Sequence, residues 1–87
     1  MKNTASEPFA IRLADERHAD ELAHELAAID GIRVEQNGDR REVLIGGAIT
    51  DRVVTGVLDG LRRALAGEPT ATAWVFLDGR EYQFEGE

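Results

Sequence analysis

The chain has 87 residues, a formal net charge of -7 and no cysteine. A chain of this length forms one domain and has no room for a cleft between two domains. The negative charge repels phosphate backbones and anionic membrane surfaces, and the lack of cysteine excludes disulfides and thiolate chemistry. We therefore expect a cytoplasmic single-domain protein with neither a nucleic-acid nor a membrane partner.

The N-terminal residues 1–8 contain one Lys and no apolar run. They predict a flexible tail and not a secretory signal or a membrane anchor. The folded domain is expected over residues 9–87. It begins with a strand, because Phe9, Ile11 and Leu13 alternate with other residues at the period of a half-buried strand.

Apolar residues recur every three or four positions from Asp15 to Ile29, which predicts a one-sided helix. Asp15 is its expected N-cap, and Gly31 can take the left-handed position that ends it. His18 and His24 lie six residues apart, so they cannot form the metal-binding pair that needs helical i, i+4 spacing. We expect both histidines on the solvated face of this helix.

The turn dipeptide Asn37-Gly38 predicts a first hairpin, with strands over 33–36 and 41–45. Two registers are open. A two-residue turn pairs Glu35 with Arg40, whereas a four-residue loop pairs Val34 with Val43. Both registers put the same four apolar side chains on one face: Ile32, Val34, Val43 and Ile45.

Gly46-Gly47 is predicted to be a flexible joint before a second helix, which Thr50 caps. The joint could offer backbone amides to an anion, but no Lys follows and Asp51 is negative, which favours a simple loop. The helix carries an apolar stripe and stops at Gly67 and Pro69. The stripe consists of Val53, Val54, Val57, Leu58, Leu61 and Leu65. Gly56 and Gly60 within the same helix indicate either close packing inside the domain or a docking groove.

Asp78-Gly79 predicts a second hairpin with a tight primed turn that pairs Leu77 with Arg80. Its first face is apolar enough to be a core face and consists of Ala73, Val75, Leu77, Tyr82 and Phe84. The second face carries Trp74 and Phe76 among polar residues, and a large aromatic pair on a solvated face suggests a contact surface.

The expected order is therefore strand, helix, hairpin, helix, hairpin. Two one-sided helices and five short strands predict an α+β, two-layer sandwich in which both helices cover one face of a mainly antiparallel sheet. Its natural topology is a ferredoxin-like βαββαβ core with an extra C-terminal strand.

The opposite sheet face is the expected binding site, because nothing in the predicted fold covers it. The candidate residues are Leu44, Trp74 and Phe76, with Glu81 and Gln83 as a polar rim. Burial of the aromatic pair under the tail or in another strand arrangement is the alternative. Single-stranded RNA binding is disfavoured, because the Arg residues are dispersed and form no positive groove.

No catalytic residue, metal ligand or cofactor site is predicted. The single serine, Ser6, lies in the tail, and the carboxylates lie at polar positions where nothing raises their reactivity. We therefore expect a protein that is not an enzyme.

Four stretches resemble one family: FAIRL (9–13), ADELAHELAAIDGI (19–32), VLIGGAITDRVVTGVLDGLRRAL (43–65) and WVFLDGREYQFEGE (74–87). Their pattern looks like the effector-associated constant component family of bacterial conflict systems. The resemblance implies a small non-enzymatic adaptor that acts beside separately encoded effectors such as peptidases.

The first functional hypothesis is accordingly a protein-interaction or adaptor module that binds a protein partner or a second copy through its sheet face. The alternative is a small-ligand-sensing regulatory domain that dimerises through its sheet and binds a ligand near Gly46-Gly47.

Overall fold

The computed structural model describes residues 9–37 and 40–86, and the predicted tail over 1–8 lies outside them. The described residues form five strands and two helices in the expected order. They are β1 (Phe9–Leu13), α1 (Glu16–Leu26), β2 (Ile32–Asn37), β3 (Glu42–Gly47), α2 (Asp51–Ala64), β4 (Thr72–Leu77) and β5 (Arg80–Glu85).

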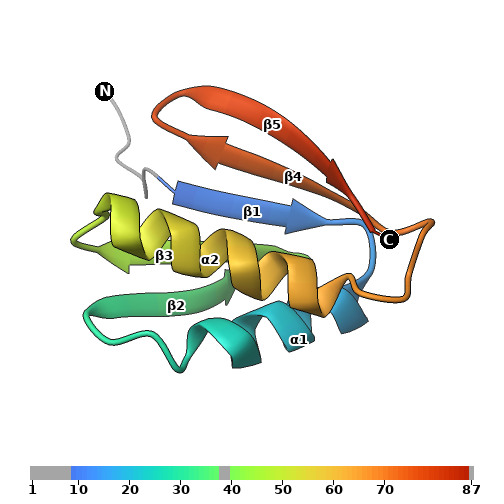
Figure 1. The fold of residues 1–87 in the computed structure, drawn as a ribbon, viewed down its shortest axis with the longest axis horizontal. Helices are drawn as coiled ribbons and strands as arrows, with labels where there is room; N and C mark the ends of the chain where they lie inside the picture. The colour runs from blue at the N-terminus through green and yellow to red at the C-terminus, as the bar shows by residue number, and fades with distance from the viewer. Residues whose placement is uncertain (1–8, 38–39, 87) are drawn as a thin grey trace.

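The five strands form one antiparallel sheet in the order β2-β3-β1-β4-β5, with β2 and β5 at its two edges (Figure 1). Both helices pack on the same face of this sheet. Their buried side chains share a single apolar cluster with Phe9, Ile11 and Leu13 of β1. The predicted α+β class, with two helices and an antiparallel sheet, is therefore confirmed.

Both helices begin at a residue whose side chain caps the first turn. The Asp15 carboxylate accepts a hydrogen bond from the backbone N–H of Arg17 at 2.8 Å, and the Thr50 hydroxyl accepts one from the N–H of Val53 at 3.2 Å. Both predicted N-caps are therefore present. Gly67, at φ +77, follows the end of α2 as expected.

The end of α1 differs from the prediction. The helix stops at Leu26, and the N–H of Ile29 bonds to the Leu26 carbonyl in a tighter turn. Gly31 has the expected positive φ of 89°, but it lies in the turn into β2 and not at the end of the helix. The tighter turn allows Ile29 to pack against Gly56 of α2, since a Cβ at Gly56 would lie 3.4 Å from Ile29 Cδ1.

The glycines of α2 serve packing inside the domain. A Cβ at Gly60 would lie 3.2 Å from Leu26 Cδ2 and 3.4 Å from Glu25 Cβ, both on α1. The side of α2 that carries Gly56 and Gly60 is thus occupied by α1 and its following turn. The docking-groove interpretation of these two glycines is wrong.

The terminal hairpin has the predicted register. Leu77 pairs with Arg80 and Val75 with Tyr82, and Asp78 and Gly79 have φ values of 53° and 76°. Both central residues are therefore left-handed, as the primed turn requires.

The burial of this hairpin was predicted wrongly. Tyr82 and Phe84 lie on the helix side of the sheet, opposite the core residues Val75 and Ala73, but they remain 45% and 36% exposed. The reason is their position on β5 at the sheet edge (Figure 1), where neither helix covers them fully.

The first hairpin has neither of the two predicted registers. Val34 pairs with Ile45 and Asn37 with Glu42, so the intervening loop spans 38–41, of which the structure describes Arg40 and Arg41. The predicted face is retained, because this register has the same parity as the other two. Arg40 has a φ of 70°. Its guanidinium group also binds two acidic residues of α1. Local turn propensity cannot predict such a long-range contact.

Candidate functional site

The open face of the sheet, on the side away from the helices, is the candidate site. In β4 the side chains of Ala73 and Val75 are buried in the core, so the alternating Trp74 and Phe76 lie on the open face. Both aromatics are half-buried. The orientation expected for this pair is therefore observed, although neither side chain is fully exposed.

Two cross-strand rows build this face. The first row runs Glu35, Leu44, Ala10, Phe76 and Glu81, and the second runs Asn37, Glu42, Arg12, Trp74 and Gln83. The five candidate residues, Leu44, Trp74, Phe76, Glu81 and Gln83, thus all belong to two neighbouring rows. Side chains directly opposite in an antiparallel pair lie about 5 Å apart, so each row is a continuous line of contacts.

Ala10 and Arg12 complete the site and were not among the candidates. Ala10 is 9% exposed and lies between Leu44 and Phe76, so the first row has an apolar centre three residues wide. Arg12 is exposed and pairs with both Glu42 and Trp74. The alternation in 9–13 places these residues on the open face, but only the central position of β1 in the sheet brings them between the candidates.

The surface at the aromatic pair is shallow. One open depression is lined by Arg12, Trp74, Phe76 and Glu81. Its apolar floor lies between one cationic and one anionic side chain. Such a surface suits contact with another protein more than enclosure of a small ligand, because small ligands bind in concave pockets that bury most of their area.

His18 was predicted on a solvated face and is instead buried, with 6% of its area exposed. Its Nε2 lies 3.1 Å from Glu68 Oε1, and the Arg17 guanidinium donates to the same oxygen at 2.6 Å. The cause is the loop after α2, which carries Glu68 across the first turn of α1. The Glu68 side chain is 39% exposed, so its carboxylate is not in the desolvated setting of a typical catalytic acid or base.

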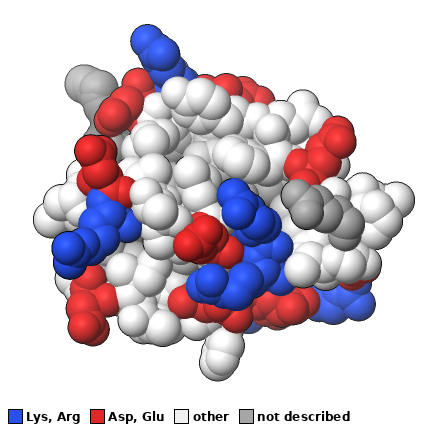
Figure 2. All heavy atoms as spheres, in the orientation of Figure 1, with Lys and Arg blue, Asp and Glu red and all other residues white. Residues whose placement is uncertain are grey.

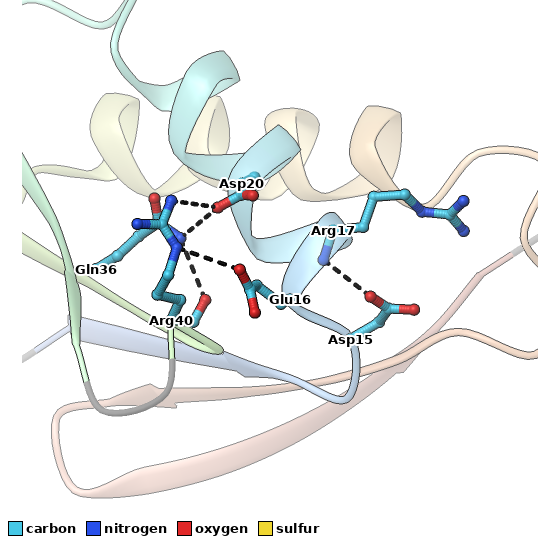
Figure 3. Close-up of polar contacts among 6 residues, drawn as sticks. All are labelled: Asp15, Glu16, Arg17, Asp20, Gln36 and Arg40. Atoms are coloured by element: carbon cyan, nitrogen blue, oxygen red, sulfur yellow. Dashed lines mark hydrogen bonds and ion pairs between the residues drawn. The ribbon is translucent and has the colours of Figure 1, made fainter.

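A second polar cluster joins the first hairpin to α1 (Figure 3). Arg40 lies 3.3 Å from Glu16 Oε2 and donates to Asp20 at 3.0 Å, and Gln36 donates to Asp20 at 2.8 Å. Hydrogen bonds from Gln36 and Arg40 hold the pKa of Asp20 below its usual range. The cluster is exposed and mutually satisfied, which is typical of a structural link.

The two glycines that precede α2 are part of the sheet and do not form the predicted joint. Gly46 is buried and pairs with Arg33, and both residues belong to β3. Gly47 has φ +107, and a Cβ there would come within 2.7 Å of the Gly31 carbonyl. Close backbone contact explains this glycine.

Within residues 9–37 and 40–86, no three His, Asp or Glu side chains are grouped so that they could hold a metal ion. In the same part of the chain, neither helix is long and apolar enough to cross a membrane.

Comparison with models of known protein families, with characterised proteins and with solved structures finds no match for this chain.

Proposed function

We propose that this protein is a non-enzymatic interaction module, an adaptor or regulatory subunit, that binds a protein partner through the open sheet face. The observation that carries this proposal is the apolar row Leu44, Ala10 and Phe76 beside Trp74. Aromatic side chains with a polar surround are the usual energetic centre of a protein–protein contact.

The charges of this face favour a partner with basic groups. By strand alternation, four carboxylates lie on it, Glu35, Glu42, Glu81 and Glu85, against the two guanidinium groups of Arg12 and Arg33. The whole chain also has a net charge of -7. Complementary charge speeds the encounter of two proteins and selects against partners of the same sign.

Two observations support a more specific assignment of the fold and of the biological role. In the strand order β2-β3-β1-β4, β3 lies between β1 and β2, and β1 lies between β3 and β4. These two split β-α-β units support a ferredoxin-like core to which β5 is added. The resemblance to the effector-associated constant component family supports an adaptor in a bacterial conflict or signalling system, which would act in the cytoplasm.

The test is the double substitution Trp74→Ser, Phe76→Ser. The wild-type chain and the variant are each immobilised, and the proteins that each one captures from a lysate of the native host are compared. A protein that only the wild type retains is then purified, and its affinity for the wild type and for the variant is measured by titration. We expect the variant to bind it at least about tenfold more weakly, since truncated anchors typically cost more than 1 kcal/mol.

The matched control is Tyr82→Ser, Phe84→Ser, which removes two aromatics from the other face of the sheet. It should keep the binding. Trp74 is the only tryptophan, so its fluorescence reports directly on the open face of the wild type and of this control. If the Trp74 and Phe76 double variant unfolds while association is unchanged, the aromatics are core residues and the proposal fails.

A further inference from the structure

The edge of the sheet at β5 is a second surface that nothing in the described chain covers. β5 is one of the two edge strands, and all of its side chains, Arg80–Glu85, are exposed. No described helix or strand lies beyond it (Figure 1). Figure 2 shows the molecule from the helix side, with a largely uncharged surface between α2 and this edge and acidic side chains along much of the upper border.

The backbone of β5 points hydrogen-bonding groups outward at every second residue. In an antiparallel pair, residues that bond to the partner strand alternate with residues that bond away from it. The residues that flank the two-residue turn form a bonded pair. With the same parity, the N–H of Gly86 donates to the Ala71 carbonyl at 2.9 Å. The even-numbered residues of β5 therefore bond to β4, and the N–H and C=O groups of Glu81, Gln83 and Glu85 point away from the sheet.

β5 lacks several features by which a monomeric protein protects such an edge. Its pairing with β4 runs without a bulge along the whole strand, and it contains neither Pro nor Lys. A regular edge of this kind is a template for another strand. An added strand would also cover Tyr82 and Phe84, which are 45% and 36% exposed. The charges that β5 does carry, on Arg80, Glu81 and Glu85, then decide which strand fits.

A second copy of β5 fits this edge with two-fold symmetry. Bonded pairs form only where outward-pointing residues of the two copies meet, so an axis near the middle of the strand passes at Tyr82 or at Gln83. An axis at Gln83 sets Glu81 opposite Glu85 of the second copy, and like charges directly opposite each other are destabilising. An axis at Tyr82 sets Glu81 opposite Gln83 instead and opposes no like charges.

The axis at Tyr82 gives both backbone and side-chain contacts. The N–H of Gln83 donates to the Glu81 carbonyl of the second copy, and the N–H of Glu81 donates to the Gln83 carbonyl. The two Tyr82 side chains meet at a non-bonded position, where opposite side chains are closest. Arg80 lies opposite Phe84 of the second copy, a pairing that suits a guanidinium group on an aromatic ring. Because the axis is perpendicular to the sheet, the exposed aromatics of both copies lie together on the helix side.

We propose that a second copy of the chain binds at this edge, with the two β5 strands antiparallel about Tyr82, so that the two sheets join into one. The recognition is strand addition by an identical strand. The net charge of -7 on each copy opposes association at long range, so the dimer should strengthen with added salt. The open face with Trp74 and Phe76 takes no part in this contact, so this proposal and the proposed function can fail separately.

The test measures self-association of the whole chain by analytical ultracentrifugation at concentrations up to about 100 µM. Gln83→Pro removes an outward N–H and keeps every bond to β4, since an edge strand tolerates proline where the nitrogen faces solvent. Gln83→Thr is the matched control, because it changes the same side chain and keeps the N–H. We expect a wild-type dimer that Gln83→Pro weakens at least about tenfold and Gln83→Thr retains. Tyr82→Ser, Phe84→Ser should weaken it as well, whereas Trp74→Ser, Phe76→Ser should not.

Two further measurements do not require the proline variant to fold. In the wild type, amide hydrogen exchange at Glu81 and Gln83 should slow as the concentration rises, whereas the amides of Tyr82 and Phe84 already bond to β4. The chain has no cysteine, so Tyr82→Cys introduces a single thiol. Under oxidation this variant should form a linked dimer, because Cα atoms at a non-bonded pair lie about 4.5 Å apart, within the range of a disulfide. Gln83→Cys should link far more slowly, since the two substituted positions are not opposite each other.

Three results would overturn the proposal. The first is a wild-type chain that stays monomeric over the whole concentration range. The second is a dimer that the folded Gln83→Pro variant leaves unchanged or that Trp74→Ser, Phe76→Ser dissociates, because the second copy would then lie elsewhere. The third is faster linking of Gln83→Cys than of Tyr82→Cys, which would place the axis at Gln83 and contradict the charge argument.

Discussion

Gly60 of α2 lies directly against Leu26 of α1, so that a Cβ at Gly60 would be 3.2 Å from Leu26 Cδ2. The two helices approach closely at this point because α2 has no side chain there. Glycine is unfavourable inside a helix, and the close packing of α1 on α2 explains its presence at this position.

Gly60→Val is expected to lower the free energy of unfolding by about 1 to 3 kcal/mol, because a branched side chain cannot enter without separating α1 from α2. Gly56→Ala is the matched control. Its Cβ would meet the flexible end of Ile29 at 3.4 Å, and the better helix propensity of Ala should raise stability by up to about 1 kcal/mol. Urea denaturation measures both, and a neutral Gly60→Val would contradict the packing argument.

Leu61→Ala tests the centre of the core. Leu61 is 1% exposed, and its truncation should cost roughly 2 to 5 kcal/mol through lost burial and a residual cavity. The same change at the half-buried Leu58 should cost less. Denaturant titrations that show a loss below about 1 kcal/mol for Leu61→Ala would mean that this side of α2 does not face the core.

Asp20→Asn tests the link between the first hairpin and α1. Because the folded-state pKa of Asp20 is lowered, its stabilising effect is complete above the unfolded-state pKa of about 3.9 and is lost as the pH falls through the folded-state value. The variant should therefore melt below the wild type at neutral pH, and the difference should shrink in acid below about pH 3.9.

Thermal melts of Asp20→Asn are compared with those of Asp59→Asn, an exposed position on α2. Added salt should also reduce the effect at Asp20, since its partner Arg40 is an exposed cation. Identical pH profiles for the two variants would show that the cluster in Figure 3 does not stabilise the fold.

Glu68→Ala tests the contact with His18. The substitution leaves the buried His18 ring without its hydrogen-bond partner, an effect worth about 1 to 3 kcal/mol. Glu68→Gln retains a side-chain oxygen at the same place and should lose less. Chemical denaturation at pH 7 distinguishes the two, and equal losses would indicate that the contact contributes nothing specific.

Much of the fold could be predicted because its signals are local. The caps Asp15 and Thr50, the stop at Gly67 and the Asp78-Gly79 turn each act within a few residues, and the structure contains all four. The same alternation that indicated β4 also placed Trp74 and Phe76 on the open face. Periodicity determines which side chains share a face, since it follows from backbone geometry alone.

What covers each face was decided by the tertiary structure. Tyr82 and Phe84 share the core side of the sheet but lie on its edge strand, His18 is buried by a loop fifty residues away, and the first hairpin takes a register in which Arg40 reaches α1. Each of these outcomes depends on contacts between segments distant in sequence. Sequence period therefore determined the faces of this protein, whereas the number and placement of the helices over the sheet determined which of those faces remain open.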